Sequence, residues 1–121
     1  MKKKRFLCVE DHPDTCELIA TILDEFEVIS AGSKAEALRK AATLKFNLYL
    51  LDYHLPDGTG MELALLIRNF DPETPILFVT GTSSLTEKQA IKIGAQGVIK
   101  KSSKTFVEDL TNKAQELLKV E

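Results

Sequence analysis

Five short apolar runs alternate with helical patterns along the chain, and this alternation constrains the fold more than any other feature. The runs cover residues 6–9, 28–31, 48–51, 76–79 and 97–99. They are almost continuously apolar, as is typical of parallel strands that are covered on both faces. Each intervening segment is long enough for a right-handed crossover helix. We therefore predict an α/β fold, a doubly wound (βα)5 three-layer sandwich around a parallel sheet.

The connecting helices have recognisable starts and apolar stripes. Pro13 suits a first helical turn. Three later helices are predicted to open with capping boxes, which satisfy free backbone N–H groups: Ser33 with Glu36, Thr59 with Glu62, and Ser84 with Glu87. The first helix is predicted to bury Leu18, Ile19, Ile22, Leu23 and Phe26, and the last to bury Val107, Leu110, Ala114 and Leu117.

The length and net charge of the chain limit the number of domains and the kinds of binding partner that we expect. The 121 residues suffice for one domain, residues 1–121, with no output domain. Sixteen basic and eighteen acidic residues give a net charge of −2, so we expect no direct binding of nucleic acid. No apolar run could span a membrane, and the run at residues 6–9 is too short for a signal peptide. We expect a cytoplasmic protein that does not bind membranes.

The two cysteines do not form a disulfide framework. Cys8 lies within an apolar run, where a thiol usually behaves as a small buried hydrophobic group. Cys16 is not at the C-x-x-C spacing of a redox motif. We therefore interpret both as structural.

Polar residues gather at the carboxyl ends of four predicted strands. Domains of this flavodoxin-like kind commonly have the strand order 2-1-3-4-5 and bind ligands at the ends of strands 1 and 3. The residues that follow or end the strands there are Glu10 and Asp11, Asp52, Thr80, and Lys101. Three close carboxylates resist full ionisation unless a cation compensates, and Mg²⁺ prefers oxygen ligands. A metal, an ammonium and a hydroxyl together suit phosphoryl transfer to an aspartate.

Four segments in register resemble the receiver domain of bacterial two-component systems. They are residues 9–14 (VEDHPD), 51–60 (LDYHLPDGTG), 79–81 (VTG) and 94–101 (GAQGVIKK), so the resemblance extends over essentially the whole chain. Each segment alone is weak evidence, because acidic pairs and Thr-Gly steps are common in turns and at helix starts. Their convergence on one sheet edge is what favours function.

The resemblance implies a role for each residue. Asp52 is the expected phosphoacceptor, taking its group from a sensor histidine kinase or a histidine phosphotransfer protein. Mg²⁺ or Mn²⁺ is the expected cofactor, with Asp11, Asp52 and the backbone carbonyl of His54 as ligands and Glu10 acting through water. Thr80 and Lys101 are expected to bind phosphoryl oxygens, and Lys101 is favoured over Lys100 by its spacing from Gly94. The family acts as a signalling phosphoacceptor and not as an enzyme with a separate substrate.

Some positions concern regulation more than chemistry. His54, two residues after the acceptor, and Thr82 are hypothesised to tune the lifetime of the phosphoryl group. His12 is interpreted as a helix-start residue, because its spacing matches no zinc motif. The family usually has an aromatic residue where Val98 stands, and Val98 is stiff and lacks a ring. It also usually has proline where Ser102 stands, so the preceding peptide bond is either trans or cis at a cost of about 3 kcal/mol.

Three alternatives stay open at this point. A phosphatase of the haloacid-dehalogenase kind needs a D-x-D strand end, which residues 52–54 lack. A flavin-binding domain needs a phosphate-cradling loop after the first strand, where this chain is acidic. A receiver-like interaction module that works without phosphorylation is the strongest alternative, although such modules tend to lose the site residues that are retained here.

Overall fold

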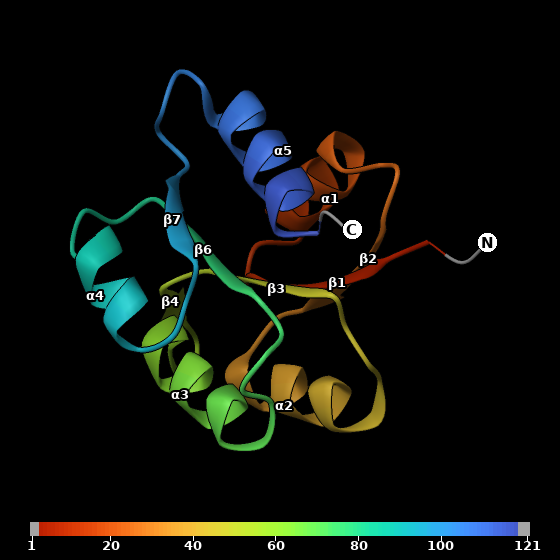
Figure 1. Cartoon of the computed structure of the whole chain (residues 1–121), viewed down its shortest axis with the longest axis vertical. Helices are drawn as coiled ribbons and strands as arrows, with labels where there is room; N and C mark the ends of the chain where they lie inside the picture. Colours follow the sequence, from red (N-terminus) through yellow and green to blue (C-terminus); the bar gives the residue numbers. More distant parts are fainter. Residues whose placement is uncertain (1–2, 119–121) are drawn as a thin grey trace.

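The computed structural model describes residues 3–118, so both ends of the predicted domain, residues 1–2 and 119–121, lie outside the described residues. A five-stranded parallel sheet forms the centre (Figure 1), with its strands in the order β2-β1-β3-β6-β7. These strands are β1 (Arg5–Val9), β2 (Glu27–Ala31), β3 (Leu48–Leu51), β6 (Ile76–Thr80) and β7 (Gly97–Lys100). A separate two-residue pair, β4 (His54–Leu55) and β5 (Gly58–Thr59), follows β3. The predicted order 2-1-3-4-5 is therefore confirmed for the five main strands.

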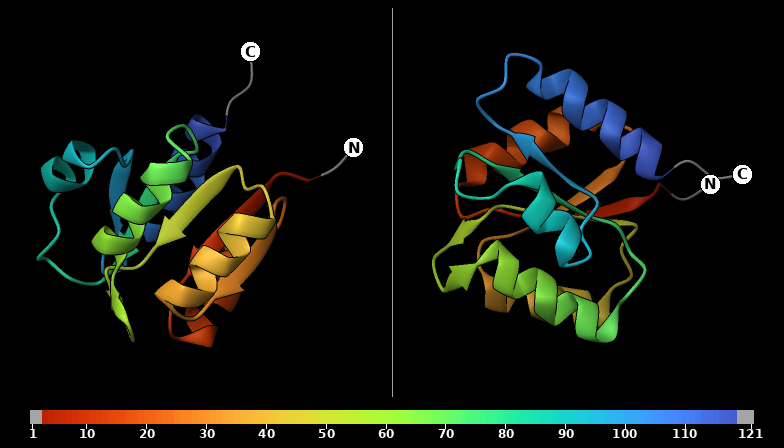
Figure 2. Two further views of the ribbon diagram at one scale, coloured as in Figure 1. Left: turned by 90° about the horizontal axis from the view of Figure 1, so that it is seen from below. Right: turned by 60° about the vertical axis from the view of Figure 1, so that its left-hand side comes forward.

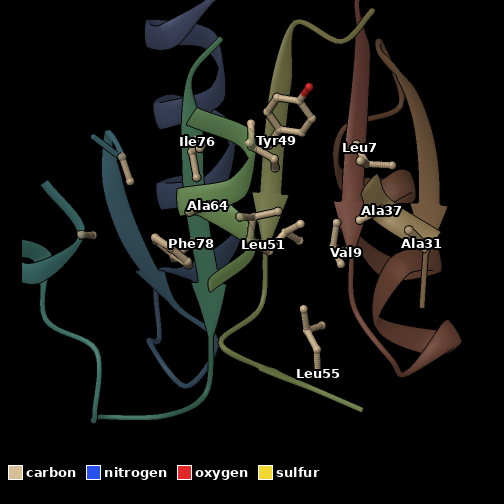
Figure 3. Close-up of a cluster of buried hydrophobic side chains, with 14 of the residues drawn as sticks. Leu7, Val9, Ala31, Ala37, Tyr49, Leu51, Leu55, Ala64, Ile76 and Phe78 are labelled. Carbon is tan, nitrogen blue, oxygen red and sulfur yellow. The ribbon is translucent and has the colours of Figure 1, made fainter. Parts of the chain in front are cut away.

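Five helices cover the two faces of the sheet and complete the predicted three layers. They are α1 (Pro13–Ile22), α2 (Lys34–Thr43), α3 (Gly60–Phe70), α4 (Glu87–Lys92) and α5 (Phe106–Leu117). Helices α1 and α5 lie on one face, and α2, α3 and α4 on the other (Figures 1 and 2). Each face has its own apolar cluster. The larger cluster joins Leu7, Leu51 and Phe78 of the sheet to Ala64 of α3 (Figure 3).

The residues of the predicted apolar stripes are buried or half-buried except at one position in each helix, but Leu23 and Phe26 follow α1, which ends at Ile22. Leu18 and Val107 are 52% and 53% exposed. In α1 the buried positions are Cys16 and Ile19, so the inward face is centred away from Leu18. In α5 the half-buried Phe106 packs against the core in the place predicted for Val107.

The predicted helix starts are correct in two cases, half correct in one and wrong in one. Pro13 stands in the first turn of α1, and Thr59 and Glu62 form the predicted capping box of α3. Ser33 caps α2 by accepting from Glu36 N, but the Glu36 carboxylate accepts from Gly32 N, not from Ser33 N.

The start of α4 is the wrong prediction. This helix begins after Thr86, which forms a capping box with Gln89, and not after Ser84 with Glu87. Leu85 is 1% exposed and packs into the core. Its burial, two residues before the helix, keeps the preceding segment in a loop.

The connection from β3 to α3 returns close to the end of β3. Gly60 N donates to Tyr53 O at 2.6 Å, which brings the start of α3 against the residues after β3. The Asp57 carboxylate accepts from Lys34 N at 2.7 Å and Ala35 N at 2.9 Å, and thereby ties the loop to the start of α2. Among the described residues, no helix is both long and apolar enough to cross a membrane.

Gly60 is expected to tolerate no side chain, although it begins a helix. A Cβ there would lie 2.1 Å from the Asp52 carbonyl oxygen, which is backbone and cannot rotate away. Gly60→Ala should lower the free energy of unfolding by about 1–3 kcal/mol, as overpacking generally does. Urea denaturation measures the change.

Gly81→Ala is the matched control for this substitution. A Cβ at Gly81 meets no heavy atom within 4 Å. Its free energy of unfolding should stay within about 0.5 kcal/mol of the original or rise slightly. Equal effects of the two substitutions would contradict the steric argument.

Candidate functional site

The sheet brings four of the predicted site residues to one edge. Glu10 directly follows β1, Asp52 follows β3, and Lys101 follows β7, while Thr80 is the last residue of β6. The strand register aligns these ends, because Val9 pairs with Leu51 and Thr80 pairs with Lys100. Figure 3 shows the ends of β1, β3 and β6 pointing the same way, with Leu55 just beyond them.

The Lys101 ammonium links the two strand-end carboxylates. Its Nζ atom lies 3.2 Å from Asp52 Oδ2 and also donates to Glu10 Oε2 in a close ion pair. Glu10 is 4% exposed and Asp52 is half-buried, so both carboxylates are largely removed from water. A buried carboxylate is costly unless it is paired, and one lysine pairs with both here.

The pKa values of the three groups in this cluster are shifted in different directions. Burial raises the pKa of Glu10 to about 7, with the neighbouring Asp52 carboxylate adding to the effect against the opposing pull of Lys101. Burial also acts to raise the pKa of Asp52, but hydrogen bonding to Glu10 and the charge of Lys101 outweigh it and lower that pKa. The pKa of Lys101 is raised, because its bonds to Glu10 and Asp52 outweigh its burial. Asp52, with its lowered pKa, is therefore the carboxylate of this cluster that stays ionised.

The backbone also holds the Asp52 side chain. Asp52 Oδ1 accepts from Tyr53 N at 2.7 Å, while the backbone N–H of Asp52 donates to Val9 O at 3.0 Å. One carboxylate oxygen thus faces the backbone and the other faces Lys101. Both interactions favour the charged form of the carboxylate.

A second acidic group lies beside this cluster and suits a hard cation. One ligand atom from each of Glu10, Asp11 and His12 lies within 4.8 Å of the others. His12 caps α1 as predicted, and its backbone N–H donates to Glu10 Oε1 at 3.2 Å. Asp11 is exposed, and its carboxylate lies 3.7 Å from Nε2 of the His12 ring. Two carboxylates this close together fit Mg²⁺, which prefers oxygen ligands and keeps several waters.

Thr80 lies at the buried base of the loop that leads to α4. It is 1% exposed, and its hydroxyl accepts from Thr82 N at 3.2 Å. The Thr82 hydroxyl in turn accepts from Ser84 N at 3.1 Å. Because the Thr80 hydroxyl accepts the bond from Thr82 N, its own proton is available to a group at the strand ends.

Lys100 has a structural role that the sequence analysis did not find. Its Nζ atom donates to Thr82 O and Leu85 O, both at 3.0 Å, and so holds the loop between β6 and α4. Neighbouring residues of a strand point to opposite sides. This alternation could have predicted that Lys100 and Lys101 point to different sides. Lys100 contacts the loop, whereas Lys101 contacts the carboxylates.

The other predicted site residues differ in their burial and in what they contact. The His54 side chain is exposed, and its ring packs edge-on against Tyr53 at 4.8 Å between centroids. Val98 is half-buried and packs against the larger apolar cluster. Ser102 is exposed and follows a trans peptide bond, so the trans alternative holds at this position.

Comparisons with known proteins agree with this geometry. The sequence matches the response regulator receiver domain family over residues 6–115. It is 38% identical over 98 residues to the response regulator protein PilR of Pseudomonas aeruginosa, covering 78% of this chain and 22% of that protein. It is 34% identical over 105 residues to the transcriptional regulatory protein CrdR of Helicobacter pylori, covering 84% and 49%. The chain thus spans between about a fifth and a half of these relatives.

Solved structures show the same fold. A CheY-like receiver domain protein from Methanospirillum hungatei superposes with a TM-score of 0.86 at 32% identity, covering 97% of this chain and 94% of that one. The response regulator protein TrrA from Thermotoga maritima, solved in complex with Mg²⁺-BeF, has a TM-score of 0.85 at 30% identity, covering 95% and 99%.

The fold and the acidic cluster at the strand ends together define a signalling domain of the flavodoxin-like class. The chain belongs to the family of response regulator receiver domains, the phosphoacceptor domains of two-component systems. Receiver domains bind Mg²⁺ in their acidic pocket and interact with histidine kinases. Membership of this family argues against both the phosphatase and the flavin-binding alternatives.

Glu10 is expected to titrate far from the ordinary range of a glutamic acid. Without divalent cations, its side-chain carbon signal in NMR should shift with a midpoint near pH 7, compared with an ordinary value of 4.5. Because the pKa is raised in the folded state, the stability from this group is fully present below pH 4.5 and is lost as the pH rises through about 7.

Added Mg²⁺ should lower this midpoint, because a cation favours ionised carboxylates and its binding releases protons. Glu17, an exposed glutamate of α1, serves as the reference signal in the same spectra. A Glu10 midpoint close to 4.5 in the metal-free protein would contradict the charge distribution described above.

Proposed function

We propose that this receiver domain accepts a phosphoryl group on Asp52. The observation that carries the proposal is the bridge from Lys101 to both Asp52 and Glu10, because it keeps Asp52 ionised at the ligand-binding edge of the sheet. A histidine kinase or a histidine phosphotransfer protein is the proposed donor. In the transfer, an Asp52 carboxylate oxygen forms a bond to phosphorus while the bond from phosphorus to the donor's imidazole nitrogen breaks. The imidazole leaves with the electron pair of that bond.

Three side chains and one carbonyl group are proposed to hold the divalent cation. Asp11, Asp52 and the backbone carbonyl of His54 would bind it directly, and Glu10 would bind through water. The closeness of the Glu10 and Asp11 carboxylates supports this set. Mg²⁺ or Mn²⁺ held by these groups would supply positive charge opposite the phosphoryl oxygens.

The remaining groups are proposed to act on the phosphoryl group itself. Lys101 would exchange its contact with Asp52 for an ion pair with a phosphoryl oxygen, keeping a buried positive charge close to its present position. Thr80 would donate its hydroxyl proton to another phosphoryl oxygen while it still accepts from Thr82 N. These two contacts, with the cation, spread the charge of the transferred group.

The readout of phosphorylation is proposed to pass through the loop between β6 and α4. A movement of Thr80 toward the phosphoryl group would pull on the segment that Lys100 holds at Thr82 O and Leu85 O. Val98 lacks the ring that the family usually uses in this switch, and Ser102 replaces its usual proline. We therefore propose that Lys100 and the loop carry a larger share of the signal here.

Phosphorylation of Asp52 is tested with acetyl phosphate and Mg²⁺, followed by intact-mass analysis. The original chain should gain the mass of one phosphoryl group. Asp52→Asn should gain none, because an amide oxygen is not a nucleophile of comparable strength. Asp71→Asn, which changes a carboxyl group at the opposite end of the sheet, should be labelled like the original chain.

An original chain that stays unlabelled, while a known receiver domain is labelled under the same conditions, would contradict the proposal. That result would favour the alternative of an interaction module that works without phosphorylation.

Asp11→Asn is expected to weaken Mg²⁺ binding by at least about tenfold, because loss of one anionic ligand removes a charge from the site. The change is measured through the fluorescence of Tyr53, the residue after Asp52, and by calorimetry. Asp14→Asn, an exposed change in the first turn of α1, is the matched control and should bind Mg²⁺ like the original chain. Equal weakening by both substitutions would point to a general charge effect.

His54 and Thr82 are proposed to tune the lifetime of the aspartyl phosphate. The His54 side chain is exposed two residues after Asp52, where it would limit the approach of water. His54→Ala and Thr82→Ala should each shorten the half-life about threefold, which corresponds to about 0.7 kcal/mol in the barrier. Loss of the phosphoryl mass over time measures this. Unchanged half-lives in both variants would contradict the role.

A further inference from the structure

The two cysteines of the chain meet in the structure, although their spacing in the sequence matches no redox motif. Cys8 lies in β1 and Cys16 in the first turns of α1, and their Sγ atoms are 3.5 Å apart. Both are free thiols and both are buried, with exposures of 1% and 7%. The Cys16 thiol also donates to the Cys8 carbonyl oxygen at 3.7 Å.

We propose that Cys8 and Cys16 form a two-thiol oxidation site, in which a hydroperoxide converts the pair to a disulfide that slows phosphorylation. The thiol chemistry goes beyond the proposed function, whereas the slowing of phosphorylation rests on it. A disulfide needs an S–S distance of about 2.05 Å, so the sulfur atoms must approach by about 1.5 Å. In the proposed reaction, a change of side-chain rotamer and a small shift of α1 would supply this approach.

The two thiols differ in their access to solvent, and this difference decides which of them reacts first. Cys16 lines a surface hollow of about 280 Å³, together with Pro13, Glu17, Ala20, Val28 and Ser30. Cys8 lies behind it within the sheet. A small peroxide can enter the hollow and reach Cys16 first. The pKa of Cys16 is lowered, because the Cys8 thiol can donate a hydrogen bond to its thiolate, and this assists the attack.

The reaction balances in two steps. The Cys16 thiolate attacks one peroxide oxygen, the O–O bond breaks, and with one proton taken up the products are Cys16 sulfenic acid and water or an alcohol. The Cys8 thiol then attacks the Cys16 sulfur, which forms the S–S bond, breaks the S–O bond and releases one water molecule. The peroxide takes the two electrons that the thiols lose.

The disulfide would enclose the acidic group of the site. The closed segment runs from residue 8 to residue 16 and contains Glu10, Asp11 and His12. A shift of α1 toward β1 would move Asp11 and His12 relative to Asp52. Because a misplacement of about 1 Å can cost up to about 100-fold in rate, we expect phosphorylation of the disulfide form to be about tenfold slower.

The first experiment detects the disulfide in the full native chain. The reduced protein is treated with hydrogen peroxide, quenched with catalase, unfolded, and alkylated with N-ethylmaleimide before intact-mass analysis. The original chain should lose two hydrogen atoms and take up no maleimide. Cys8→Ala should give a sulfenic acid on Cys16 that dimedone traps, while Cys16→Ala should stay unoxidised. Peptide mapping separates these products from sulfoxide on Met61.

Retention of two alkylatable thiols in the original chain, under conditions that oxidise Cys16 in Cys8→Ala, would overturn the proposal. A disulfide that joins two chains would also overturn it. Circular dichroism of each variant verifies that it is folded before treatment.

The second experiment measures acetyl phosphate labelling of the oxidised and reduced forms. The oxidised chain should be labelled about tenfold more slowly, and dithiothreitol should restore its rate. Peroxide-treated Cys16→Ala should be labelled like its untreated form. Equal rates for the disulfide and dithiol forms would overturn the regulatory part. A chain that forms the disulfide but is labelled in neither form would instead overturn the proposed function.

Discussion

The contact between the Lys101 ammonium and the two carboxylates of Glu10 and Asp52 is the interaction on which the site depends. Both acidic residues directly follow central strands of the sheet and are largely buried, so each would repel the other if both were charged and unpaired. Lys101 comes from the edge strand β7 and reaches across the end of β6 to lie between them. The three groups come together because β1 lies beside β3 and β6 lies between β3 and β7.

As a consequence of this contact, the two carboxyl groups of Glu10 and Asp52 have pKa values shifted in opposite directions. Burial raises the pKa of Glu10 to about 7, whereas the pKa of Asp52 is lowered and its carboxylate stays ionised. The same cluster can also respond to a cation, because a divalent ion would favour release of the Glu10 proton. The charge of Lys101 therefore links the ionisation of Glu10 to that of Asp52.

Much of this arrangement could be predicted from the sequence because it depends on strand ends. The apolar runs locate the strands, and Glu10, Asp52, Thr80 and Lys101 then meet wherever parallel strands end together. The trans peptide bond before Ser102 settles an alternative that the sequence left open.

Features that depend on contacts between distant side chains could not be predicted in this way. The start of α4 depends on the burial of Leu85, and the role of Lys100 depends on which loop carbonyls lie within its reach. Spacing also gave no sign that Cys8 and Cys16 touch, because the turn between β1 and α1 decides it. The outward positions of Leu18 and Val107 depend on how each helix is rotated against the sheet.

The central claim is that Asp52, and no other carboxylate of the cluster, receives the phosphoryl group. Borohydride reduction of the acetyl-phosphate-treated chain tests it most directly, because it converts an aspartyl phosphate to homoserine, which peptide sequencing locates. The account predicts homoserine at position 52 alone. A reduced residue at Asp11 or Glu10, or labelling spread over the three carboxylates, would contradict it.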